Sequence, residues 1–133
     1  MNAELSLLPK KSMPAPLSIA VLGCGSRGRT YSRLVATFPD AYRLVAAADT
    51  VALRRDAVAS LGPPGQIRTF ASADELFSAG KLADVLIIAT QDSQHFGHAT
   101  RALELGYDIL LEKPAAESLE KANEKLSGLL GKK

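Results

Sequence analysis

Short apolar runs alternate with stretches of helical periodicity from residue 17 onward. The runs are LSIAVL (17–22), YRLVAAAD (42–49), QIRTF (66–70), DVLIIAT (84–90) and YDILLE (107–112). This alternation is typical of βαβ units, in which helices connect parallel strands. The second, fourth and fifth runs are almost continuously apolar, as expected for strands covered on both faces, whereas the third is more polar and suits an edge. The pattern therefore predicts an α/β fold with a parallel sheet of five strands.

Helical periodicity fills the stretches between the runs. Four apolar side chains spaced i, i+3, i+4 and i+7 share one face of the first helix: Tyr31, Leu34, Val35 and Phe38. Pro39 ends this helix because proline cannot continue one. Further helices are predicted over 51–61, over 73–79 with Ser72 as N-cap, over 94–105 with Gly106 as terminator, and over 116–130.

The handedness of βαβ connections predicts the order of the strands. Right-handed crossovers, with a reversal of direction after the third strand, give a doubly wound, three-layer sheet of order 3-2-1-4-5. Ligands of such sheets bind in the crevice at the carboxyl ends of strands one and four. The segments GCGSRG, ATQDSQH and EKP each follow a strand, so we expect them to meet at that edge.

Composition narrows the class of protein. The 133 residues suit a single domain over 17–133, preceded by a flexible arm over 1–16 that is rich in proline and lysine. A net charge of +2 with dispersed basic residues predicts no nucleic-acid partner. No apolar run has the length of a signal peptide or a membrane span, and the single Cys24 excludes an internal disulfide. We therefore expect a cytoplasmic protein without a membrane partner.

The spacing of Gly23, Gly25 and Gly28 matches the pattern G-x-G-x-x-G between a strand and a helix. Such glycines allow a tight turn, close approach of a pyrophosphate to the backbone, and close packing of the helix on the sheet. Asp49 follows the second strand, about 20 residues beyond the last glycine, where a carboxylate can bind an adenosine ribose. It could also cap the next helix, a role compatible with ribose binding. An acid here favours NAD over NADP. Arg54 and Arg55 blur that choice because either could contact a phosphate, although an ordinary solvated helix residue is the favoured interpretation of both.

Three further residue types are candidates for chemistry. Cys24 lies at a helix N-terminus, which can activate a thiol, although a small residue tolerated in a tight loop is the favoured interpretation. His95 and His98 are spaced i, i+3, but no further ligands complete a metal site. We expect His95 to stand nearer the crevice and His98 to be structural. Lys113 could share in proton transfer if it points into the crevice.

Three segments together resemble the glucose-fructose oxidoreductase, inositol dehydrogenase and rhizopine-catabolism (Gfo/Idh/MocA) family over about residues 17 to 130. They are VLGCGSRGRTY, LVAAADTVALRR and ADVLIIATQDSQHFGHATRALELGYDILLEKPAA, in the family's order and spacing. The most specific motif is EKP after the fifth strand. The resemblance implies a Rossmann domain that binds NAD or NADP and takes part in hydride transfer to or from a sugar or cyclitol.

The resemblance also assigns roles to individual residues. Lys113 corresponds to the family's catalytic lysine, Glu112 supports it, and Pro114 shapes the turn. The residues implied to contact the cofactor are Gly23, Cys24, Gly25, Ser26, Arg27, Gly28, Asp49, Thr90, Gln91, His95, Glu112 and Lys113. Family members commonly have proline where this chain has Gln91, which affects the local loop geometry.

Length is the larger departure from the family. Its members carry a second α/β domain that binds substrate, and the chain is expected to lack that domain and to be inactive or weakly active alone. A non-enzymatic nucleotide-binding or interaction module, self-associating through the surface left uncovered, is therefore an alternative. A domain that binds S-adenosylmethionine is a further alternative, but it would not explain EKP.

Overall fold

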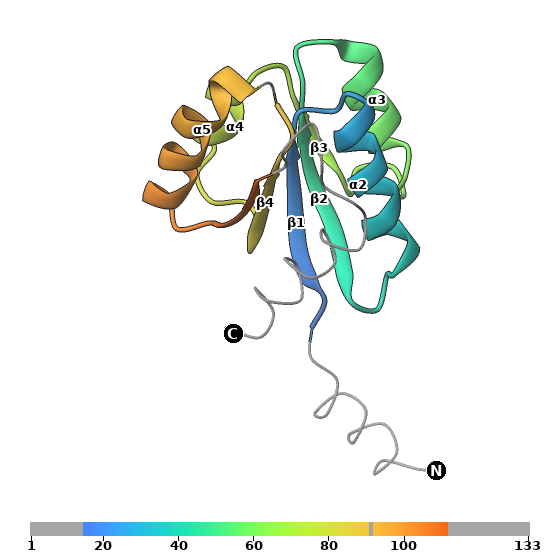
Figure 1. Ribbon diagram of the computed structural model, residues 1–133. Helices are drawn as coiled ribbons and strands as arrows, with labels where there is room; N and C mark the ends of the chain where they lie inside the picture. The colour runs from blue at the N-terminus through green and yellow to red at the C-terminus, as the bar shows by residue number, and fades with distance from the viewer. Residues whose placement is uncertain (1–14, 91, 112–133) are drawn as a thin grey trace, which may run out of the picture.

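The computed structural model describes residues 15–90 and 92–111 of the chain. Strands and helices alternate along this part of the sequence (Figure 1). In chain order they are β1 (Leu17–Leu22), α2 (Ser26–Thr37), β2 (Tyr42–Ala48), α3 (Ala52–Ala59), β3 (Arg68–Phe70), α4 (Ala73–Ser78), β4 (Val85–Ile88), α5 (Asp92–Glu104) and β5 (Asp108–Leu111). The helix predicted over 116–130 and residues 1–14 of the arm predicted over 1–16 lie outside the described residues.

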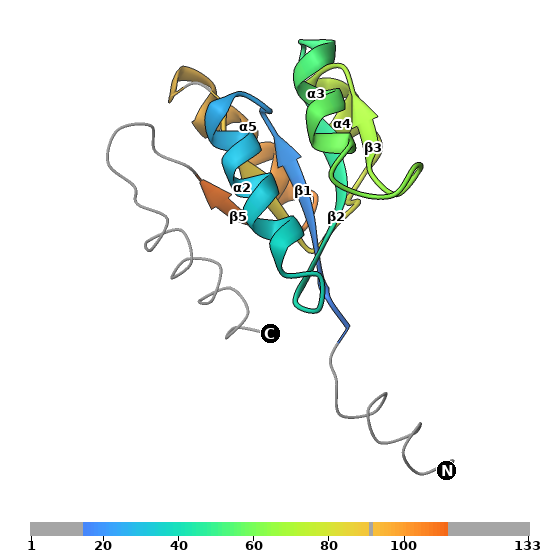
Figure 2. The ribbon, with the colours of Figure 1, turned by 90° about the vertical axis from the view of Figure 1, so that its right-hand side faces the viewer.

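The strands form one parallel sheet of order β3-β2-β1-β4-β5, which confirms the predicted topology. β1 lies at the centre, where Ile19 is opposite Leu44 of β2 and Val85 of β4. β3, the most polar strand, lies at an edge, also as predicted. All carboxyl ends therefore face the same way, and the loops that follow β1, β2, β3 and β4 meet at one edge (Figure 2).

Alternating side chains of the sheet build two separate cores. Ile19 and Val21 of β1 face a core that also contains Tyr31 and Val35 of α2 and Val58 of α3. Ala20 and Leu22 face a second core, on the other side of the sheet, whose helical members come from α4 and α5: Leu76, Phe77 and Ala102. The three layers of Figure 1 thus follow from the period of two in the strands.

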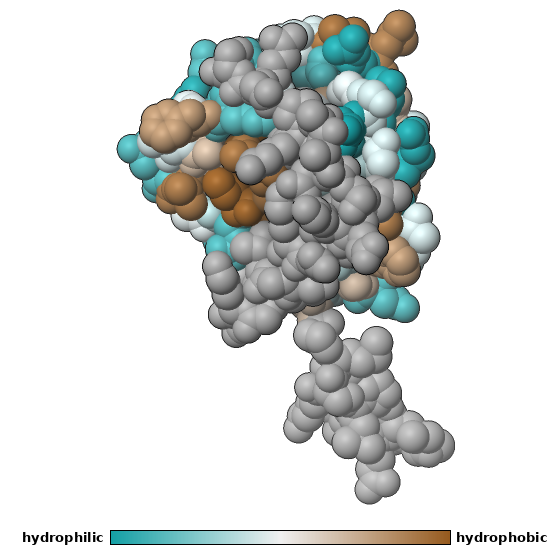
Figure 3. Space-filling model, viewed as in Figure 1, coloured by the Kyte–Doolittle hydropathy of each residue, from teal (hydrophilic) through white to brown (hydrophobic). Residues whose placement is uncertain are grey.

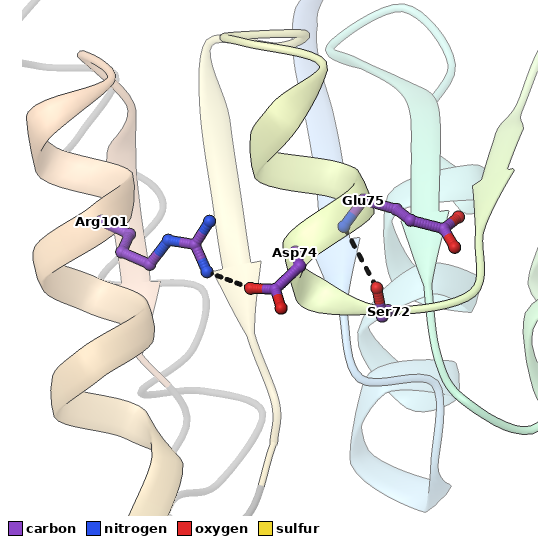
Figure 4. A network of polar contacts seen from close by, with 4 residues as sticks. All are labelled: Ser72, Asp74, Glu75 and Arg101. Carbon is purple, nitrogen blue, oxygen red and sulfur yellow. Dashed lines mark hydrogen bonds and ion pairs between the residues drawn. The ribbon is translucent and has the colours of Figure 1, made fainter.

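The ends of α2 and α4 follow the sequence signals with one exception. Ser72 is the N-cap of α4, as predicted, and its hydroxyl accepts from the Glu75 N–H at 3.1 Å (Figure 4). Tyr31 and Val35 are buried on the inner face of α2. The prediction for Phe38 is wrong, because the helix ends at Thr37 and Phe38 is the C-cap, 49% exposed.

Arg101 connects α5 to α4. Its guanidinium forms an ion pair with Asp74 (Figure 4). It also lies over the ring of Phe77, 4.7 Å from the ring centroid. Both helices begin at the edge where the strand-end loops meet. This contact therefore joins, at the surface, two elements that also pack together in the core and border that edge.

Apolar side chains are exposed on the outer face of α5. Phe96 is 84% exposed and Leu103 60% exposed, and apolar atoms are visible on the side of the molecule where α5 lies (Figure 3). Self-association of the chain stays a prediction. None of the helices in the described part of the chain combines the length and apolar character needed to cross a membrane.

Candidate functional site

A cleft of about 630 Å³ opens at the carboxyl edge of the sheet. Its walls come from the loops that follow β1 and β2, from the start of α4, and from the segment between β4 and the second turn of α5. The polar side chains on these walls are Ser26, Arg27, Asp49, Thr50, Arg54, Ser72, Thr90, Gln94 and His98. The cleft thus lies at the predicted crevice between the ends of β1 and β4.

Gly23 and Gly28 are required by packing within the protein. Gly23 has a φ of +96°, and a Cβ there would lie 2.7 Å from the carbonyl oxygen of Ala89. A Cβ on Gly28 would lie 1.8 Å from the carbonyl oxygen of Gly23. Only glycine allows the turn after β1 and the close approach of α2 to that turn.

Gly25 has no such internal requirement. Its φ of −71° is open to any residue, and a Cβ there would meet nothing within 4 Å. Gly25 lines the cleft and is the N-cap of α2, whose first turn contains no acidic residue. The first N–H groups of a helix have no acceptor within the helix and form its positive end. The space beside Gly25 therefore suits an anion that must approach the backbone closely.

Asp49 connects the ends of β1 and β2. One carboxylate oxygen accepts from the Cys24 N–H at 2.7 Å, and the other accepts from the Val51 N–H at 2.8 Å. The second bond belongs to the turn that leads into α3, but Asp49 is not the cap of that helix, whose N-cap is Val51 without a side-chain cap. Each carboxylate oxygen has two lone pairs, so a half-buried Asp49 on the cleft wall can still accept from hydroxyl groups of a ligand.

Two arginines hold the backbone of these loops. The Arg29 guanidinium donates to the carbonyl of Cys24 at 3.2 Å, and the Arg55 guanidinium donates to the carbonyl of Asp49 at 3.1 Å. Arg54, by contrast, is exposed and lines the cleft. Arg54 and Arg55 both follow Asp49 closely in the sequence, and Arg54 is thus the one of these two that is placed to meet a ligand.

The side chain of Cys24 belongs to the core. It is fully buried, and its thiol lies 3.5 Å from the carbonyl oxygen of Ala48. Burial, reinforced by the negative charge of Asp49, raises the pKa of the Cys24 thiol to about 12. The structure therefore overturns the idea of an activated thiol and favours a small core residue. Contact with a ligand through this side chain is not supported either, since the side chain does not line the cleft.

The two histidines occupy places opposite to those expected. His98 lines the cleft, whereas His95 is buried and does not line it. His95 Nε2 donates to the carbonyl of Thr90, and His98 Nδ1 lies 3.0 Å from the Thr90 hydroxyl. Within residues 15–90 and 92–111, no group of three or more His, Cys, Asp or Glu side chains could hold a metal ion.

Several predicted site residues cannot be placed. Gln91, Glu112, Lys113 and Pro114 lie outside the described residues. Conversely, the cleft includes four polar residues that sequence reasoning did not assign to it: Thr50, Ser72, Gln94 and His98. Gln94 and His98 are spaced i, i+4 on α5, so the period of the helix could have indicated their shared face once the orientation of α5 was known.

The described cleft is built for binding rather than for a covalent reaction. It joins a helix N-terminus, a carboxylate and two arginines to hydroxyl, amide and imidazole groups on its other walls. The thiol of Cys24, next to the cleft, is buried and protonated. An elongated ligand with an anionic centre and hydroxyl groups fits this arrangement.

A family model described as an oxidoreductase family with an NAD-binding Rossmann fold (GFO_IDH_MocA) matches residues 17–129. The match covers the whole described sheet and the cleft. A search of curated proteins finds no match.

Solved structures give the same fold. A myo-inositol dehydrogenase from Corynebacterium glutamicum is 31% identical, with a TM-score of 0.64, over 86% of this chain and 34% of that chain. A scyllo-inositol dehydrogenase from Lactobacillus casei, solved with NAD(H) and scyllo-inositol, is 24% identical with a TM-score of 0.65, over 88% and 33% of the two chains. Biliverdin reductase from Synechocystis, solved with biliverdin and NADP+, is 22% identical with a TM-score of 0.62, over 86% and 34%. The scyllo-inositol dehydrogenase and the biliverdin reductase, at these lower identities, support the fold alone. The chain spans about a third of the length of these proteins.

Proposed function

The chain belongs to the Gfo/Idh/MocA oxidoreductase family with an NAD-binding Rossmann fold, and we propose that its cleft binds a nicotinamide dinucleotide for hydride transfer. The dinucleotide would lie across the carboxyl ends of β1 and β4, with its pyrophosphate at the N-terminus of α2. When bound, it supplies a ring that accepts or donates hydride. The residues described here bind and orient it.

The space beside Gly25 carries the proposal. Gly23 and Gly28 are explained by the packing of the protein, so they would be needed even in a Rossmann domain that binds nothing. Gly25 is not explained in this way, because a Cβ there would enter open space at the helix N-terminus. Close approach of a pyrophosphate to the backbone provides the missing reason.

Asp49 and Arg54 bear on the choice of cofactor. We propose that Asp49 accepts from the adenosine ribose hydroxyls, which favours NAD, since a carboxylate repels the additional phosphate of NADP. Arg54 lies on the same wall and would weaken this preference. Relatives solved with NAD(H) and with NADP+ agree with a fold that accommodates either one.

The remaining proposals concern the reaction. By analogy with the myo-inositol dehydrogenase, we propose a sugar or cyclitol as the substrate, with Lys113 assisting proton transfer and Glu112 supporting it. Thr90 and Gln91 would lie on the nicotinamide side. Hydride transfer needs the substrate held in a defined geometry, and the described walls supply only the cofactor side. We therefore expect binding without turnover unless a substrate domain is present.

Titration with NADH and NADPH, followed by nicotinamide fluorescence, tests the proposal. We expect NADH to bind the wild-type chain more tightly than NADPH. Gly25→Asp should weaken binding of both more than tenfold, because its carboxylate fills the space meant for the pyrophosphate. The same substitution should leave the domain as stable or stabilise it by about 0.5 kcal/mol, since aspartate is a good N-cap.

Gly97→Asp is the matched control. Gly97 is exposed on α5, a Cβ there would also meet nothing within 4 Å, and the residue does not line the cleft. Its variant adds the same charge and should bind NADH like the wild type. A wild type that binds neither nucleotide, or a Gly25→Asp chain that binds as tightly as Gly97→Asp, would contradict the proposal.

A further inference from the structure

Thr90 stands at a central place in the cleft wall. It lies two residues after the end of β4, beside the turn after β1, and α5 holds it at two points. His95 donates to its backbone carbonyl, and His98 pairs with its hydroxyl at 3.0 Å. The i, i+3 spacing places both histidines on the face of α5 that turns toward the end of β4. The pair of histidines thus has a common partner.

The two contacts differ in what they can do. The bond from His95 holds the main chain, and His95 is buried away from the cleft. The contact of His98 is made to a side chain that lines the cleft, by a side chain that lines it too. The contact of His98 can therefore set the orientation of the Thr90 hydroxyl toward a ligand, whereas the bond from His95 cannot.

The surroundings of His98 support an uncharged ring. Burial lowers the pKa of His98 below its ordinary value of 6.5, and the nearby positive charge of Arg101 adds to this, while Asp74 opposes it. The ring also lies 6.2 Å from that of Phe77, centroid to centroid, on the α4 side. A neutral imidazole is fixed between a hydroxyl and an aromatic ring.

We propose that His98 is a positioning residue of the cleft, which fixes the rotamer of Thr90 and so presents the Thr90 oxygen to the dinucleotide in one orientation. The inference rests on the proposed function. Without His98 the Thr90 hydroxyl would rotate toward another partner. The bound dinucleotide would then lose a hydrogen bond whose geometry is already set in the free protein. Preset geometry lowers the cost of ordering the site on binding.

NADH titrations of paired variants test this role. His98→Ala and Thr90→Val should each raise the dissociation constant for NADH roughly threefold to tenfold, the usual range for one hydrogen bond. His98→Asn should bind within about twofold of the wild type, because its amide lies where Nδ1 of the imidazole lies. The double variant His98→Ala/Thr90→Val should be no weaker than either single variant, because both remove the same contact.

Thr100→Val is the control on the same helix. The Thr100 hydroxyl is exposed and donates to the Phe96 carbonyl within α5, so its loss should leave NADH binding unchanged. Unfolding in urea checks that each variant folds. If His98→Ala does not fold, Thr90→Ser, which keeps the hydroxyl, is compared with Thr90→Val, and only the valine variant should bind more weakly.

The outcomes separate the two proposals. If the wild type binds neither nucleotide, the proposed function fails and the positioning role fails with it. If the wild type binds NADH but His98→Ala binds equally well, only the positioning role is overturned. Losses that add up in the double variant, or a His98→Asn chain as weak as His98→Ala, would overturn it as well, because the two side chains would then act separately.

Discussion

At the scale of single residues, surroundings decide the chemistry that a residue type can perform. Cys24 sits at a helix N-terminus, where the partial positive charge would lower the pKa of an exposed thiol. Burial and Asp49 outweigh this effect and raise the pKa to about 12. The same Asp49 accepts from the Cys24 N–H at 2.7 Å, so the residue contributes its backbone to the loop and its side chain to the core.

We predict that Cys24 does not react with a thiol reagent at pH 8 in the native chain and reacts fully in urea. The thiol is protonated and enclosed, and only unfolding exposes it. Its folded-state pKa lies above the ordinary value of 9.0, so its contribution to stability is complete below pH 9 and is lost as the pH rises toward 12. Measured at pH 8 and about pH 10.5, the free energy of unfolding should fall more for the wild type than for Cys24→Ala. Rapid native labelling would contradict the assignment.

At the scale of elements, α2 joins the fold and the cleft. Its inner face packs Tyr31 and Val35 against the sheet, and its N-terminus opens into the cleft. Gly28 makes both possible, because it lets the first turn of the helix contact the turn at Gly23 without a side chain between them.

We predict that Gly28→Ala destabilises the domain by roughly 3 kcal/mol. The new methyl group would overlap the carbonyl oxygen of Gly23, and backbone atoms can relieve that overlap only by separating α2 from the sheet. Gly97→Ala, on an open part of α5, should instead stabilise by up to about 1 kcal/mol, as alanine does in helices. Urea denaturation of both variants measures the difference. Equal midpoints would show that α2 does not approach the turn so closely.

At the scale of the whole molecule, the cleft exists only when the sheet is assembled. Its walls come from segments that span residues 22 to 98 and that meet because five parallel strands end at one edge. The unfolded chain has no such site. A ligand of the cleft must therefore stabilise the folded domain as a unit.

We predict that NADH at about 100 times its dissociation constant raises the free energy of unfolding by about 2.7 kcal/mol. The rise should appear as a higher urea midpoint with the same slope. Gly25→Asp should show little of this shift at the same NADH concentration. An unchanged midpoint for the wild type would mean that NADH does not bind the folded state.

The sequence by itself determined the α/β class, the order of the strands and the three glycines of the turn. These features depend on the local pattern of the sequence. Apolar runs have the length of strands, the stretches between them have helical spacing, and residues such as Gly23 and Ser72 set a turn or a cap by their own chemistry. The handedness of βαβ connections then leaves one order, because the polar third run belongs at an edge. Asp49 could be found for the same reason, since its position follows from the end of a strand.

Only the tertiary structure decided which side chains face the cleft and which are enclosed. His98 rather than His95 lines it, because the orientation of α5 depends on its packing against β4 and α4 and not on its own periodicity. Cys24 turned inward because the core that encloses it is built from several strands and helices, whereas Phe38 is exposed because α2 ends at Thr37. Distances such as that between His98 Nδ1 and the Thr90 hydroxyl arise from the packing of whole elements, which no local pattern encodes.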